Sequence, residues 1–181
     1  MDVLQLLVGG IANGCIYGLV ALGFVLIYKA SEAVNFAQGD MLMLGAFLGL
    51  SFINADGADL PFVLGLTAAA ICLGIFGYLL DRVVLRAIFG QPQFAMVILT
   101  IALGFIMRFA AGVIWGHDPV SLETPFAGQV LRFSGLNIPV ADLIIIIATV
   151  LMTGGLWLFF SHTRLGVAMQ AASQNQMAAY Y

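Results

Sequence analysis

The sequence begins with a long stretch that contains no charged side chain. Residues 3–28 are all uncharged, and 14 of them are Leu, Ile, Val or Phe. About 20 apolar residues in a helix suffice to cross the roughly 30 Å hydrocarbon core of a bilayer. The stretch is too long for the apolar core of a signal peptide, and no basic residue precedes it. It therefore predicts a retained transmembrane helix.

Four further stretches meet the same criterion, and the composition agrees with them. Of the 181 residues, 62% are hydrophobic and only 8% are charged, whereas soluble domains carry about 25% charged residues. Lipid must therefore be the main solvent. We expect an all-α fold, a polytopic transmembrane helical bundle that forms one domain over residues 1–181. The predicted spans are residues 3–28, 36–54, 60–80, 94–115 and 141–160.

Basic residues are distributed unevenly between the loops. Lys29, Arg82, Arg86 and Arg164 follow the first, third and fifth spans, whereas the opposite loops contain only Arg132. Because cytoplasmic loops are enriched in Lys and Arg, the N-terminus is expected outside and the last residues inside. The net charge of −3 and the lack of a basic cluster argue against nucleic acid as a partner.

The end of the chain predicts a cytoplasmic helical segment over residues 161–181. Ala, Gln and Met favour a helix there, and no Gly or Pro ends it. We therefore expect an N-terminal portion of a longer protein, incomplete at its C-terminus. The only lysine is Lys29, so the phosphate-binding loop Gly-Lys-Ser/Thr is absent. If ATP drives transport, another subunit must hydrolyse it, and segment 161–181 could contact that subunit or lie on the membrane.

Glycines recur every four residues in the first two spans. A stripe of this kind lets a neighbouring helix approach closely, so close packing is the expected role. Lining a translocation path is the alternative. The residues of the stripes are Gly10, Gly14 and Gly18 in the first span and Gly45 and Gly49 in the second.

Amide side chains mark two more places. Asn13 lies beside the first glycine stripe, where it could hydrogen-bond to another helix or contact a water-filled path. Asn35 and Gln38 precede Asp40 at the start of the second span. Asn35 could cap the N-terminus of that helix, and the negative charge of Asp40 would interact favourably with the positive end of the helix dipole. The alternative is a polar, partly unwound segment that lines a pore.

Arg108 is the only cation within a predicted span. An ionisable residue in this position is by default a functional candidate, although the side chain could also snorkel to the outer interface. Asp40 lies about four residues into its span and Arg108 about fourteen, so their depths would differ by roughly 15 Å if both spans began at one surface. Direct pairing of the two charges is therefore not expected.

No pattern of catalytic residues stands out. His117 and His162 lack neighbouring ligands at metal-binding spacing, and Cys15 and Cys72 sit in apolar runs as small buried residues. We expect no enzyme activity, no metal and no cofactor in this chain.

Three motifs together resemble a known family. They are Asn35-Phe36-Ala37-Gln38-Gly39-Asp40, Leu99-Thr100-Ile101-Ala102-Leu103-Gly104 followed by Arg108, and Thr163-Arg164-Leu165-Gly166. These motifs are similar to those of bacterial ABC-transporter permeases of the branched-chain amino-acid type. Urea and short-chain amide permeases share them, so they specify the family better than the solute.

The resemblance implies a permease of the inner membrane with several partners. These are a second permease subunit, two cytoplasmic ATPase subunits and a periplasmic solute-binding protein. The last cytoplasmic segment would couple the permease to the ATPase. The coupling residues that the resemblance implies are Arg164, Leu165, Gly166, Met169, Gln170, Ser173 and Gln174.

The leading hypothesis is import of branched-chain or other apolar amino acids. Residues expected to face the path are Asn13, Asn35, Gln38 and Thr100. A urea or amide permease, a self-sufficient channel or secondary transporter, and a purely structural membrane subunit are the alternatives. Asp142 is counted with the outer loop, so Asp40 and Arg108 are the only ionisable groups expected to be buried in the membrane, which argues against proton coupling.

Overall fold

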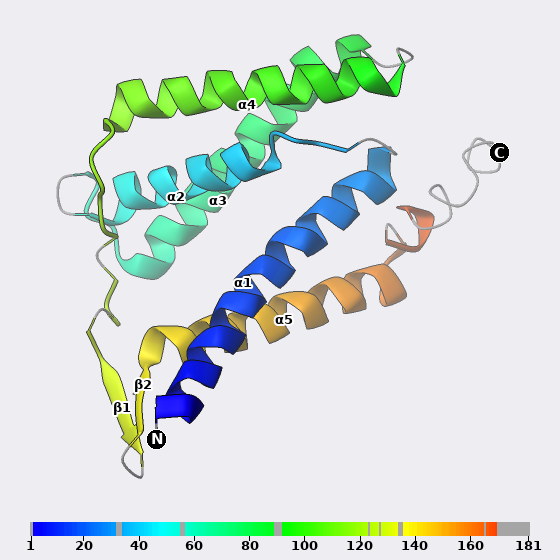
Figure 1. The fold of residues 1–181 in the computed structure, drawn as a ribbon. Coiled ribbons are helices and arrows are strands. Elements are labelled where there is room, and N and C mark those ends of the chain that lie inside the picture. Colours follow the sequence, from blue (N-terminus) through cyan, green and yellow to red (C-terminus); the bar gives the residue numbers. More distant parts are fainter. Residues whose placement is uncertain are drawn as a thin grey trace. The chain divides into compact units, whose positions relative to one another are not determined.

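The structure is a computed structural model, and its described residues include five α-helices of 16 residues or more and one short hairpin. The chain divides into two compact units, shown together in Figure 1. Residues 1–32 and 126–181 form the α1/α5 unit, and residues 33–125 form the α2–α4 unit. The structure describes residues 2–31, 34–54, 57–88, 92–122, 124–126, 128–133, 136–164 and 166–169.

The α1/α5 unit contains two long helices that lie side by side. Helix α1 spans Asp2–Ser31 and α5 spans Val140–His162. Figure 1 shows them running in the same general direction. A Cβ built on Gly9 of α1 would lie 3.7 Å from Asp142 Oδ2 of α5, so the third turn of α1 lies close to the first turn of α5. This direction is the one required of a first and a fifth crossing.

A small antiparallel hairpin precedes α5. Strand β1, Val130–Phe133, pairs with β2, Leu136–Pro139, and Leu131 is opposite Ile138. The predicted spans leave these residues in the loop between residues 115 and 141, with no strand expected there. Strands of four residues are too short to show a reliable alternation of apolar and polar side chains.

The α2–α4 unit contains a shorter helix packed against two long ones. Helix α2 spans Gln38–Ile53, α3 spans Phe62–Leu80 and α4 spans Gln93–Trp115. In Figure 1, α2 and α4 run in the same direction and α3 runs in the opposite one. These directions are the ones required of the second, third and fourth crossings.

Within the described part of the chain, four helices are long and apolar enough to cross a membrane, and the expected all-α, multi-pass membrane class is confirmed. The four segments are residues 5–29, 62–85, 94–115 and 140–162. Helix α2 is shorter than the predicted span 36–54, with 16 residues. Its length of about 24 Å falls short of the roughly 30 Å hydrocarbon core. Non-helical residues 34–37 precede it.

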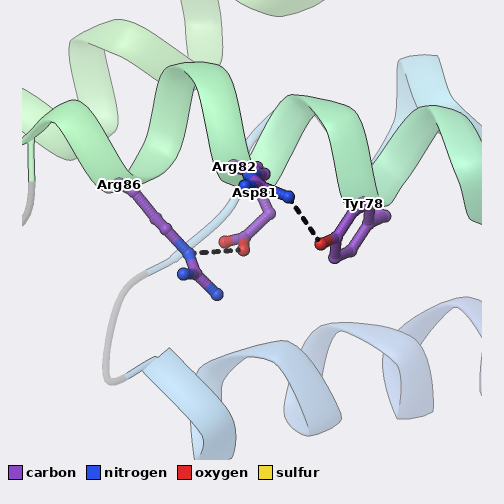
Figure 2. A network of polar contacts seen from close by, with 4 residues as sticks. All are labelled: Tyr78, Asp81, Arg82 and Arg86. Atoms are coloured by element: carbon purple, nitrogen blue, oxygen red, sulfur yellow. Dashed lines mark hydrogen bonds and ion pairs between the residues drawn. The ribbon is translucent and has the colours of Figure 1, made fainter.

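The basic residues after α3 lie on a helical extension rather than in a loop. A π-helical turn, η1 (Asp81–Leu85), and a 3₁₀ turn, η2 (Arg86–Ile88), continue α3. Arg82 Nη1 donates to the Tyr78 hydroxyl at 3.2 Å, and Arg86 Nε contacts Asp81 Oδ2 at 3.3 Å (Figure 2). Both arginine side chains are exposed, and an aromatic residue beside them is typical of a membrane interface.

Two glycines lie at close contacts between α2 and α3, and only one of them, Gly45, belongs to the predicted stripes. A Cβ on Gly65 of α3 would collide with Ile53 Cγ1 of α2, and a Cβ on Gly45 would lie 3.1 Å from Leu73 Cδ2. Gly49 is buried but has open space for a Cβ. For Gly10, Gly14 and Gly18, no described atom lies within 4 Å of a built Cβ, so their packing role stays a prediction.

Two glycines of α3 offer a matched test of this packing. In Gly65→Ala, the added methyl meets Ile53, whereas in Gly74→Ala it meets nothing within 4 Å. Overpacking costs about 1–3 kcal/mol, while alanine improves helix propensity by about 1 kcal/mol at either site. We expect Gly65→Ala to have the lower midpoint of thermal unfolding in detergent. Equal midpoints would show that Ile53 moves aside freely.

Candidate functional site

The residues leading into α2 form a turn stabilised by a side chain. Asn35 Oδ1 accepts a hydrogen bond from Ala37 N at 3.0 Å, which is the usual contact of an asparagine with the backbone two residues later. Ala37 is the residue that precedes the helix, and no side chain caps α2. The prediction that Asn35 caps the helix is therefore wrong, because its side chain is engaged one turn earlier.

Thr100 connects this turn to α4. Its hydroxyl oxygen accepts from Phe36 N at 3.3 Å and donates to Val97 O at 3.0 Å. Thr100 is only 1% exposed, so the contact lies inside the interface of the two helices. A backbone N–H that is not in a helix thereby gains a partner where water is scarce.

Asp40 and Arg108 form a direct ion pair, which contradicts the expectation from their depths. Arg108 Nη2 lies 2.8 Å from Asp40 Oδ1, and Arg108 Nε lies 3.0 Å from the same oxygen. The Asp40 side chain is 11% exposed and that of Arg108 is 66% exposed. The pair is thus enclosed on its acidic side and open on its basic side.

The depth estimate failed because α2 and α4 do not begin at the same level. Asp40 lies beside Gly104, which is eleven residues after the start of α4, whereas Asp40 is two residues after the start of α2. The difference of nine residues corresponds to about 14 Å along the axis. Side chains also point toward the N-terminus of their helix, so Arg108 reaches back by one turn to Asp40.

Gly104 allows Asp40 to lie directly against α4. A Cβ built on Gly104 would collide with Asp40 Oδ2 and would lie 3.9 Å from the Cα of Ala37. Any side chain at this position would therefore displace the Asp40 carboxylate from its place against α4. The sequence contained Gly104 within a recognised motif but offered no role for it.

An aromatic contact connects the other end of α2 to α4. The rings of Phe47 and Trp115 stack with centroids 5.1 Å apart, and Trp115 Nε1 donates to Ser51 Oγ at 2.7 Å. Beyond the helices, Asn54 Nδ2 donates to Ser121 O at 3.1 Å. Sequence reasoning missed these contacts, although a Trp at the end of a span signals a side chain that needs a polar partner.

We call this line of contacts between α2 and α4 the polar seam. It comprises the turn at Asn35, the hydroxyl of Thr100 and the Asp40–Arg108 pair. Two of the four predicted path residues, Asn35 and Thr100, lie at its start. The seam places non-helical backbone and two charges at a level well inside the length of α4.

Comparison with known proteins identifies the family of the chain. A family model described as "Branched-chain amino acid transport system / permease component" matches residues 6–181. The chain belongs to this family. Its members are permease subunits of transporters rather than catalytic proteins.

Two curated bacterial relatives illustrate the permease family. The chain is 27% identical over 182 residues to the high-affinity branched-chain amino acid transport system permease protein BraD of Pseudomonas aeruginosa. It is 26% identical over 183 residues to LivH of Escherichia coli K12. Each alignment covers 95% of this chain and 59% of the relative.

An archaeal relative shows similar coverage. The probable permease protein LivH of Methanocaldococcus jannaschii is 26% identical over 185 residues, with 97% of this chain and 56% of the relative covered. The chain therefore spans less than two thirds of the length of these curated relatives. No solved structure matches the chain.

The other two predicted path residues of the permease, Asn13 and Gln38, are not part of the polar seam. Asn13 Nδ2 donates to Gly9 O at 3.1 Å, which is a bond within α1 rather than to another helix. Gln38 is the first residue of α2 and is half-buried. Their contact with a path stays a prediction.

Helix α5 of the permease ends at His162, directly before Thr163. Thr163 has extended backbone, and its hydroxyl donates to Phe159 O at 2.6 Å and accepts from Gly166 N at 3.0 Å. A threonine that binds the N–H three residues later is a helix N-cap, and residues 164 and 166–169 are helical.

Gly166 is buried where this new turn meets α5. A Cβ there would collide with Phe159 O, whereas Arg164 and Met169 are exposed. The other predicted coupling residues, Leu165, Gln170, Ser173 and Gln174, lie outside the described residues.

Two substitutions of similar size test whether the Thr100 hydroxyl stabilises the protein. Thr100→Val removes the acceptor of Phe36 N while keeping the shape of the side chain, and an unsatisfied buried donor costs about 1–3 kcal/mol. We expect a lower midpoint of thermal unfolding for Thr100→Val and a nearly unchanged one for Thr100→Ser. Equal values for the two variants would mean that the hydroxyl does not stabilise the seam.

Proposed function

We propose that this protein is the membrane-spanning permease subunit of an ATP-driven importer of branched-chain or other apolar amino acids. The observation that carries the proposal is the family match over residues 6–181, together with relatives that are named as branched-chain amino acid permeases. The four long apolar helices fit a role within the bilayer. Urea and short-chain amides are the alternative solutes.

The polar seam supports a path beside α2. Non-helical backbone at membrane depth is tolerated only inside protein or beside water, and residues 34–37 precede a helix too short to cross alone. Asn35, Gln38 and Thr100 would face or border this path. Asn13, on α1, is a separate candidate for contact with a water-filled path. An apolar amino acid needs few polar contacts along such a path if a separate binding protein selects it.

The turn after α5 supports coupling to an ATPase. A helical turn that is capped by Thr163 and held on α5 by Gly166 would transmit motion instead of bending. ATP binding by two cytoplasmic ATPase subunits would move this turn and switch the helices between outward- and inward-open states. A second permease subunit and a periplasmic binding protein would complete the complex in the bacterial inner membrane, with the N-terminus outside.

Uptake assays test the proposed solute and the need for ATP. The intact protein would be expressed with its genomic neighbours in cells that lack branched-chain amino acid uptake. We expect accumulation of radiolabelled leucine that depends on the ATPase subunits, with competition by isoleucine and valine. Competition by urea or acetamide instead would favour the amide permease. Equilibration of leucine without any ATPase subunit would indicate a self-sufficient channel.

Two glycine variants test the coupling turn. In Gly166→Ala, the added methyl meets the backbone of α5, whereas in Gly155→Ala no described atom lies within 4 Å of it. We expect Gly166→Ala to reduce uptake about tenfold or more at equal membrane abundance, since a small misplacement in a transmitting element has large effects. Gly155→Ala should stay near the unsubstituted rate. Equal rates would remove the coupling role from Gly166.

A further inference from the structure

We propose that Asp40 and Arg108 are positioning residues whose ion pair, seated on Gly104, fixes the level at which α2 begins beside α4. That level places the non-helical residues 34–37 opposite Thr100. The positional claim rests on the helix geometry alone. Its consequence for transport rests on the proposed function.

Asp40 is held from two sides. One carboxylate oxygen, Oδ1, accepts from both Nε and Nη2 of Arg108. The other, Oδ2, faces Gly104 so closely that no Cβ would fit between them. The carboxylate therefore lies between a guanidinium group and the backbone of α4, and a shift of α2 along α4 would break both contacts.

The other directional contacts of this interface join neutral groups: Phe36 N binds the Thr100 hydroxyl, and Trp115 Nε1 binds Ser51. Met107 and Ala111, which follow Gly104 on α4, are buried and apolar and offer no directional contact. No side chain caps α2. A slip of one helical turn would move Asp40 by about 5.4 Å and leave a buried carboxylate without its cation. Setting register is the best-attested use of such polar pairs in apolar interfaces.

The unequal exposure of the pair predicts unequal effects of neutralisation. Arg108→Gln leaves Asp40 charged where its side chain is only 11% exposed. Asp40→Asn instead leaves a cation whose side chain is 66% exposed and long enough to extend toward the outer interface or to another partner. The double variant has no unpaired charge, and its two amides can hydrogen-bond. Arg108→Gln should therefore be the more harmful single change, and the double variant should recover part of the loss.

A buried cysteine can report the position of α2. Ala37 is 2% exposed and lies on the turn beside Gly104, whereas Ala111 is 1% exposed and lies farther along α4. Ala37→Cys and Ala111→Cys would be made separately in a background with Cys15→Ala and Cys72→Ala. Labelling by a membrane-impermeant maleimide, applied to either face of membrane vesicles, measures the accessibility of each cysteine.

We expect Arg108→Gln to raise the labelling rate at position 37 about tenfold and to leave that at position 111 unchanged, a size within the range of coupling between contacting residues. Asp40→Asn should raise it less, and the double variant and Arg108→Lys should restore slow labelling. Gly104→Ala should raise it as well. The matched control is Gly49→Ala, because that buried glycine has no described atom within 4 Å of a built Cβ.

Transport measured in the same variants tests the functional consequence. The maximal rate of leucine uptake should fall and recover in parallel with the protection of position 37. The apparent KM should not change, because solute capture is assigned to a separate binding protein.

Unchanged labelling in both Arg108→Gln and Gly104→Ala, or equal increases at positions 37 and 111, would overturn the positional claim. Labelling that changes while uptake does not would overturn its link to transport. Absence of leucine uptake in the unsubstituted protein, with the labelling pattern intact, would count against the proposed function alone.

Discussion

A carboxylate within a pair of apolar helices must be neutralised at its own level, because no water can move to it without cost. Asp40 meets this requirement through Arg108, and the pair lies where Gly104 lets α2 touch α4. The level of this contact determines where α2 begins. The turn at Asn35, the Thr100 hydrogen bond and the stacking of Trp115 on Phe47 are all aligned with it.

The sequence was informative about what enters the bilayer. Uncharged runs of about 20 residues are physically costly anywhere else, so the long helices followed from length and charge alone. The hairpin before α5 could not be predicted in this way, since four-residue strands show no reliable alternation of apolar and polar side chains. Helix α2 was predicted too long because Phe36 and Ala37 are apolar, although both residues belong to a turn.

The candidate site was foreseen in its residues but not in its geometry. Asn35, Asp40, Thr100 and Arg108 were each singled out, but the pairing of Asp40 with Arg108 was rejected on depth. That estimate assumed that both helices begin at one membrane surface, and nothing in a single sequence reports the stagger between two helices. Gly104 had no predicted role, because its function is visible only once its neighbour across the interface is known.

The central claim is that α2 begins about 14 Å deeper along the axis than α4, held there by the Asp40–Arg108 pair. An experimental density map of the intact protein in a lipid environment, with side chains resolved, tests it most directly. We expect the Arg108 guanidinium within hydrogen-bond distance of the Asp40 carboxylate and Phe36 beside Thr100. A map with Asp40 at the level of the first turn of α4, and with Arg108 bound elsewhere, would contradict the account.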